Sequence, residues 1–266
     1  MELLEVFGYV GALMVGIVLG LIGGGGSILT VPILVYLFGL NPITATAYSL
    51  FIVGFTSVIG AIKNFRKGFV DFKTAVIFSI PALTAVYLTR RFLVPLIPDI
   101  VFTIGSFEVT NSMFIMVFFA VIMILASISM IRKKSLHSAT TEVLQVSYNY
   151  PLIAAEGIIV GVLTGVVGAG GGFLIIPALV LLAKLPMKKA IGTSLLIVAV
   201  KSLIGFLGDL SSTSINWEFL WMFTGLSVIG IFAGVYASKF IPGQNLKKGF
   251  GYFTLAMAFY ILYKEL

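Results

Sequence analysis

The sequence contains no cysteine and only one histidine, and these two absences exclude much of enzyme chemistry. Without cysteine, the chain has no disulfide framework, no thiol nucleophile and no cysteine-ligated metal or cluster. The histidine, His137, stands in the basic, polar stretch RKKSLHSATTE, where we interpret it as a solvated loop residue. Zinc sites of the HExxH type and Ser-His-Asp triads are therefore excluded, and we predict that the protein is not an enzyme.

Charged residues are also scarce, at 10% of the chain, whereas an average soluble domain has roughly 25%. Hydrophobic residues make up 59% of the chain, and the mean hydropathy is +1.14. A chain of 266 residues has no interior large enough for this apolar surface, so the lipid bilayer must cover the rest. The first apolar stretch follows Glu2 and Glu5 rather than a basic region, which predicts a membrane helix instead of a cleavable signal peptide.

Apolar runs divide the chain into ten predicted helical segments, which indicates an all-α polytopic membrane protein. Two of them, 28–40 and 173–185, are too short to cross a bilayer, because about 13 residues at 1.5 Å each rise only about 20 Å. Each short segment follows a glycine cluster, GGGGS in the first half and GAGGG in the second. The eight segments predicted to be long enough lie near 6–23, 42–62, 71–93, 113–131, 151–168, 187–207, 217–239 and 244–264.

The two halves of the chain repeat each other. Residues 16–60 align without a gap on residues 161–205, and glycine, proline and serine positions match in register, for example Pro32 with Pro177. We therefore predict a first membrane repeat at 1–131, a cytoplasmic linker at 132–150 and a second repeat at 151–266. Each repeat holds five segments, and because this number is odd, the second repeat should enter the membrane from the opposite side.

The basic residues support this inverted topology. Most lysines and arginines lie in four loops, at 63–73, 132–134, 184–189 and 239–248. An even number of crossings separates each of these loops from the next, so all four can face the cytoplasm, with both termini outside. Arg90 and Arg91 are exceptions, because they stand at the outer end of the fourth segment. The acidic residues assigned to the outer face are Glu2, Glu5, Asp99, Glu108, Asp209, Glu218 and Glu265.

Inverted repeats that each contain a short helix after a glycine cluster predict a substrate site near the membrane midplane. Glycine allows positive φ and the close approach of a ligand to the backbone. The helix that begins after each cluster presents unpaired N–H groups and the positive end of its dipole, which favours an anion. We expect both helix ends to converge on one anion. The residues predicted to bind it here are Gly24, Gly25, Gly26, Ser27, Gly170, Gly171 and Gly172.

Two other interpretations of the glycines compete with a ligand site. Gly16, Gly20, Gly157, Gly161 and Gly165 have GxxxG spacing, which predicts close helix packing rather than ligand binding. Packing does not explain three or four consecutive glycines, which destabilise a helix. The stretch GVVGAGGG is similar to a dinucleotide-binding loop, but it follows a predicted helix instead of a strand, and no Walker lysine follows it.

Polar residues inside the predicted spans complete the candidate site. Lys201 lies in the eighth segment, where a buried cation indicates function, although its side chain alternatively extends outward toward Asp209. Glu156 is either a proton-coupling carboxylate or an interfacial residue. The hydroxyl groups of Ser49, Thr193 and Ser194 lie on the helices that follow the two short segments. They either donate hydrogen bonds to the anion or bond to the backbone of their own helix.

The paired motifs GLIGGGGSILTVPIL…NPITATAYSL and GVVGAGGGFLIIPAL…KKAIGTSLL resemble the TauE/SafE family of membrane transporters over nearly the whole chain. The resemblance implies a multi-pass inner-membrane protein of a prokaryote that moves sulfur oxyanions or small organosulfur anions such as sulfite or sulfoacetate. We therefore predict a secondary transporter, most simply an exporter, that works by alternating access. An anion-selective channel of the same fold is the alternative. The expected partners are a small anion, the lipid bilayer and either a coupled proton or cation or none, without a cofactor, nucleic acid or a defined oligomeric state.

Overall fold

The computed structural model describes residues 3–104, 107–131, 150–168, 170–181, 183, 185–210 and 213–265. Most of the predicted linker at 132–150, including His137, lies outside these residues. The described chain is almost entirely helical, which confirms the all-α polytopic class. The α-helices are α1 (Leu3–Ile22), α2 (Gly26–Tyr36), α3 (Pro42–Phe65), α4 (Phe72–Leu88), α5 (Asn111–Ile131), α6 (Tyr150–Val167), α7 (Gly172–Leu181), α8 (Met187–Asp209), α9 (Trp217–Ala237) and α10 (Gly243–Glu265).

Smaller elements follow α4 and were not predicted. A π-helical turn, η1 (Thr89–Leu93), and a 3-10 turn, η2 (Val94–Leu96), continue the helix. An antiparallel hairpin of β1 (Ile100–Ile104) and β2 (Phe107–Thr110) then leads into α5. Within the described residues, five helices are long and apolar enough to cross a membrane, namely α3, α4 with its extension, α5, α8 and α9. This number is smaller than the eight predicted. The helices α1 and α6 are interrupted by the glycine clusters, and their apolar stretches have only 17 residues each, Val6–Ile22 and Pro151–Val167.

Equivalent residues of the two halves make equivalent hydrogen bonds. Asp71 caps α4 by accepting from the Thr74 N–H, and Asn216 caps α9 by accepting from the Phe219 N–H, so both cap and donor are 145 positions apart, as in the sequence repeat. The backbone N–H groups of these two caps donate to hydroxyls on α8 and α3. The acceptors, Thr193 Oγ1 at 2.9 Å and Tyr48 Oη at 2.6 Å, are also equivalent.

The helices pack mainly between the halves. α1 lies against α9, and its equivalent α6 lies against α4, while α3 pairs with α8 and α5 with α10. Glycines permit the closest crossings. A Cβ added at Gly16 would overlap the Ser227 carbonyl of α9, and one at Gly161 would lie 2.7 Å from the Ala82 carbonyl oxygen of α4. The packing role predicted for these glycines is thus confirmed.

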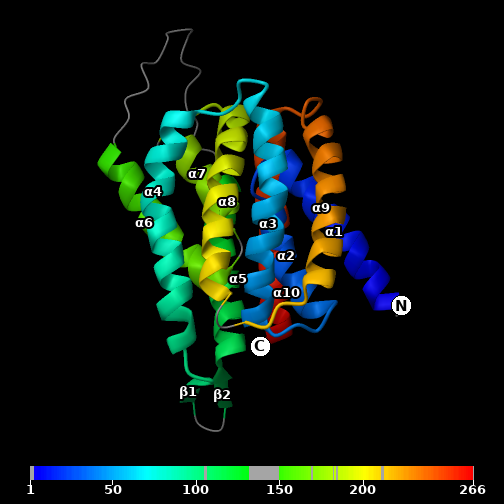
Figure 1. The fold of residues 1–266 in the computed structure, drawn as a ribbon, viewed down its shortest axis with the longest axis vertical. Coiled ribbons are helices and arrows are strands. Elements are labelled where there is room, and N and C mark those ends of the chain that lie inside the picture. Colours follow the sequence, from blue (N-terminus) through cyan, green and yellow to red (C-terminus); the bar gives the residue numbers. More distant parts are fainter. Residues whose placement is uncertain are drawn as a thin grey trace.

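Charges segregate along the bundle. The α3–α4 and α9–α10 turns lie at one end, and the β1–β2 hairpin lies at the other end, toward which both chain termini point (Figure 1). Lys63, Lys67 and Lys239 belong to the first end, whereas Glu108 and Glu218 belong to the hairpin end. Among the described residues, the predicted basic loops at 63–73 and 239–248 therefore lie at the end opposite Glu108 and Glu218, whereas the basic loop at 132–134 lies outside these residues.

Candidate functional site

The two glycine clusters meet inside the bundle. Gly23, Gly24 and Gly25 form the first glycine loop, between α1 and α2. A Cβ added at Gly24 would overlap the backbone of Gly172, and one at Gly172 would overlap the Gly24 Cα, so the two backbones are in direct contact. The expected meeting of the two interrupted helices is thus present, but Gly24 and Gly172 leave no space for an anion between them.

The first glycine loop satisfies much of its own hydrogen bonding. Gly23 has φ +77°, and its carbonyl accepts from Ser194 Oγ at 2.9 Å. Ser27 is fully buried, and its Oγ donates to the Gly24 carbonyl at 2.6 Å instead of pointing a hydroxyl toward a ligand. Gly25 is the N-cap of α2. Gly26 packs against α1, where an added Cβ would overlap the Val15 carbonyl.

The second glycine loop is defined here as Gly168, Gly170 and Gly171, which precede Gly172 at the start of α7. All three have positive φ, between +61° and +67°, a conformation that favours glycine. The Lys201 ammonium lies against Gly171 and donates to Thr164 Oγ1 of α6 at 2.8 Å. Lys201 is fully buried and binds Thr164, so the alternative in which it extends toward Asp209 is wrong.

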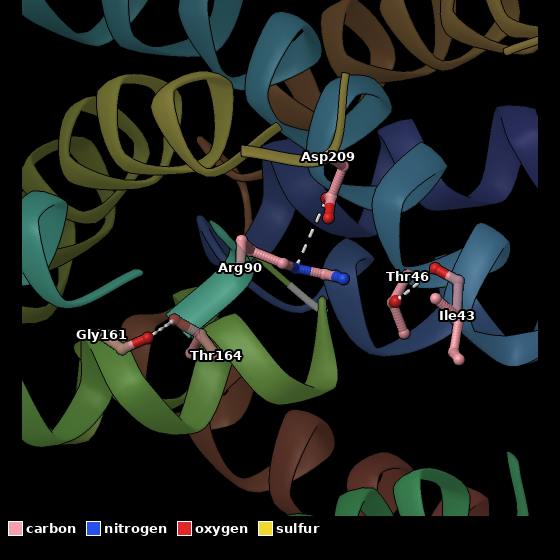
Figure 2. Close-up of polar contacts among 6 residues, drawn as sticks. All are labelled: Ile43, Thr46, Arg90, Gly161, Thr164 and Asp209. Carbon is pink, nitrogen blue, oxygen red and sulfur yellow. Dashed lines mark hydrogen bonds and ion pairs between the residues drawn. The ribbon is translucent and has the colours of Figure 1, made fainter. Parts of the chain in front are cut away.

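A second buried cation, Arg90, also lies beside this loop. Arg90 is fully buried in η1, and a Cβ added at Gly168 would overlap one of its terminal nitrogens. Figure 2 shows the side chain extending between Asp209 of α8 and Thr46 of α3. Arg90 Nε lies 3.5 Å from Asp209 Oδ2, but no guanidinium nitrogen has a hydrogen-bond partner among the described residues.

Arg90 was not among the predicted site residues. The one available signal was its exception to the positive-inside pattern, and burial explains that exception, because Arg90 is not a loop charge. Arg91, the other exception, is exposed. A lone arginine at the end of an apolar segment does not reveal whether it faces lipid headgroups or the protein interior. That depends on the distant residues, here Asp209 and Gly168, that fold around it.

The fully buried charges near the second loop do not balance. Among the described residues, the buried side chains of the acidic and basic types are those of Arg90, Lys201 and Asp209. With both cations protonated and Asp209 ionised, this group carries one net positive charge in a region from which water is largely excluded. Burying an uncompensated charge costs several kcal/mol, so this arrangement favours a bound anion.

Some of the remaining predicted residues form hydrogen bonds within the protein, and others have hydroxyls without a partner among the described residues. The Thr193 hydroxyl accepts from the Asp71 N–H, near the start of α8 and away from the second loop. The Ser194 hydroxyl contacts the first glycine loop. Ser49 Oγ is buried without a hydrogen-bond partner among the described residues, and the same is true of Ser202 Oγ, which lies beside Gly170 and was not predicted.

A bundle of membrane-length helices that contains two short helices after glycine loops, with buried cations beside one loop, is typical of membrane transporters. The sulfite exporter TauE/SafE family model matches residues 9–261, and the chain belongs to this family. The family and its named relatives are transporters, which confirms that the protein is not an enzyme.

Curated relatives agree with this assignment. A "Probable membrane transporter protein" of Xylella fastidiosa (strain 9a5c) is 29% identical over 255 residues, which cover 95% of this chain and 92% of the relative. The "Probable membrane transporter protein YunE" of Bacillus subtilis is 29% identical over 77% of this chain and 78% of its own length. The relative MJ0441 of Methanocaldococcus jannaschii is 36% identical over 42% of this chain and 44% of its own length. No solved structure matches the chain.

Proposed function

We propose that the protein is a secondary transporter that exports small sulfur oxyanions or organosulfonates, such as sulfite or sulfoacetate, across the cytoplasmic membrane. One observation carries this proposal: the basic side chains of Arg90 and Lys201 are fully buried against the second glycine loop. The family name supplies sulfite as the first substrate to test.

The chemistry of this loop suits an oxyanion. A guanidinium presents several N–H donors in a planar fork that matches two oxygens of a sulfonate or sulfite, while an ammonium supplies a compact charge. The N-terminus of α7 adds backbone N–H groups and the positive end of its dipole. Ser202 contributes a buried hydroxyl beside Gly170. The anion site that we propose therefore belongs mainly to the second half, instead of being shared equally by both loops.

Alternating access of two inverted repeats, 1–131 and 151–266, is the mechanism that we propose. The equivalent caps, the equivalent hydroxyl contacts and the equivalent helix pairs α1–α9 and α6–α4 support a common ancestor for the halves. In such transporters the halves rock against each other around a fixed central site. Export requires no ATP, because an inside-negative potential favours outward movement of an anion by about 2.3 kcal/mol per charge per 100 mV.

Reconstituted protein tests the transport activity. Purified protein should be stabilised against heat by at least one of sulfite, sulfate, thiosulfate, sulfoacetate or taurine, and proteoliposomes should take up that compound. A carrier gives saturable uptake and counterflow of labelled substrate driven by unlabelled substrate. Single-channel currents without counterflow would identify the channel instead. Failure of every compound in both assays would overturn the proposed function.

Cysteine labelling tests the orientation, in which both termini and the β1–β2 hairpin face outward. Because the chain has no native cysteine, Glu108→Cys and Arg66→Cys each introduce a single thiol, one at each end of the bundle. An impermeant thiol reagent should label Glu108→Cys in intact cells, and Arg66→Cys only after lysis. The opposite result would reverse the orientation.

A further inference from the structure

A basic pocket opens at the end of the bundle that carries the α3–α4 turn. It has a volume of about 150 Å³, and three elements line it: the end of α3 with the turn after it, the start of α8, and the end of α9. The side chains that matter here are Asn64, Lys67, Lys188, Ile191, Ser238 and Lys239. We call this cavity the basic pocket.

The charge of the basic pocket has one sign. Of the described residues that line it, three are lysines and none is acidic. Partial burial lowers the pKa of Lys67, and the nearby positive charges of Lys239 and Lys63 act in the same direction. An anion among the three lysines would offset their like charges.

One residue, Ile191, contacts both the basic pocket and the first glycine loop. Ile191 lines the pocket, and both its carbonyl and its side chain lie against Gly23. The Ser194 hydroxyl lies 2.9 Å from both the Ile191 carbonyl oxygen and the Gly23 carbonyl oxygen. Ile191 therefore lies between the basic pocket and the first glycine loop.

We propose that the basic pocket is the access site at which the transported oxyanion first binds, on the side that Ile191 closes in this conformation. This inference rests on the proposed function. The volume of about 150 Å³ equals roughly five water molecules at about 30 Å³ each, which fits a small oxyanion. It is smaller than the roughly 300–1,000 Å³ typical of pockets for drug-sized ligands. The phosphate of an anionic lipid has the same chemistry, and the test separates the two sources.

The variant Ser238→Cys places a thiol in the basic pocket of a chain that has no other cysteine. In nanodiscs of neutral lipid, an anionic maleimide should label it about tenfold faster than a cationic maleimide, because a basic cleft concentrates anions. Sulfoacetate should slow the labelling more than chloride at the same ionic strength. Adding Lys188→Gln should at least halve the rate ratio and the protection, by removing one of three charges. The matched control is Lys189→Gln, at an exposed neighbour that does not line the pocket.

The outcomes separate this inference from the proposed function. The expected transport result is a higher KM for sulfoacetate or sulfite in Lys188→Gln, with Vmax retained and Lys189→Gln unchanged. Protection no greater than that by chloride, with normal transport by the unmodified protein, would overturn the access site and leave the proposed function standing. If labelling is slowed only when anionic lipid is present, a lipid headgroup occupies the pocket, and the substrate assignment is wrong. Absence of any transport or anion-dependent stabilisation would refute the proposed function itself.

Discussion

The change Lys201→Met tests whether the buried ammonium beside the second glycine loop holds the anion. Methionine retains the length and apolar bulk of the side chain but removes its charge and its hydrogen-bond donors. The Thr164 hydroxyl, which accepts from Lys201, still donates to the Gly161 carbonyl at 3.3 Å, so the substitution leaves no unsatisfied donor there. The variant should therefore fold.

The expected loss is that of one charge-assisted hydrogen bond. Such bonds contribute about 1.5–3 kcal/mol, which corresponds to roughly 10- to 100-fold weaker anion affinity. Stability without ligand should stay level or rise, because the cost of burying the charge disappears. Lys201→Arg should retain part of the affinity, since charge matters more here than shape. Calorimetry in detergent or nanodiscs measures the affinity, and a thermal melt of the empty protein measures the stability.

Lys189→Met is the matched control, because it removes a lysine of the same helix that is exposed. It should leave affinity unchanged within about twofold, since exposed charges are strongly screened. The reasoning is refuted if Lys201→Met binds the anion as tightly as the unmodified protein. It is also refuted if both methionine variants lose affinity equally, because a general charge effect would then replace the local contact.

Two further predictions concern stability. Asp209→Asn should destabilise the protein by about 3–5 kcal/mol, because it leaves the buried Arg90 guanidinium without its carboxylate; a thermal melt unchanged from the original would show that the ion pair is unimportant. Gly24→Ala should lower the melting temperature, because the new Cβ would overlap the Gly172 backbone. Gly225→Ala should not, because a Cβ added there has no atom within 4 Å outside the backbone of its own helix. Equal melting temperatures would contradict the contact between the loops.

The helices and their breaks were largely predictable from the sequence, because membrane helices need long apolar runs and glycine clusters end them. The short helices α2 and α7 start at Gly26 and Gly172, one or two residues before the predicted starts at Ile28 and Phe173. Each helix thus includes the last glycine of its repeated motif. The β1–β2 hairpin was not predicted, because apolar periodicity does not distinguish a short hairpin from a loop.

The polar site was only partly predictable. Lys201 stands out in any reading, because a cation in an apolar helix is rare. The position of Thr193 beside Ser194 predicts a role in substrate binding, but its hydrogen bond from the Asp71 N–H depends on a turn 122 residues away. Contacts of this kind arise from how the halves pack, and no local pattern records them.

The sequence repeat supplies a matched control residue for the proposed anion site. Ser202 and Ser57 occupy equivalent positions of α8 and α3, and both hydroxyls are buried without a hydrogen-bond partner among the described residues. In the second half, Ser202 lies beside Gly170 and next to Lys201 in the sequence. In the first half, the position equivalent to Lys201 is the neutral Thr56. If the anion binds at the second glycine loop, Ser202→Ala should remove one donor and weaken affinity by roughly tenfold, while Ser57→Ala should leave affinity unchanged. Neither substitution should lower the melting temperature, because each removes a hydroxyl without a hydrogen-bond partner in the described part of the chain. Equal losses of affinity in calorimetry would show that both loops share the anion symmetrically and would refute the assignment of the site to the second half.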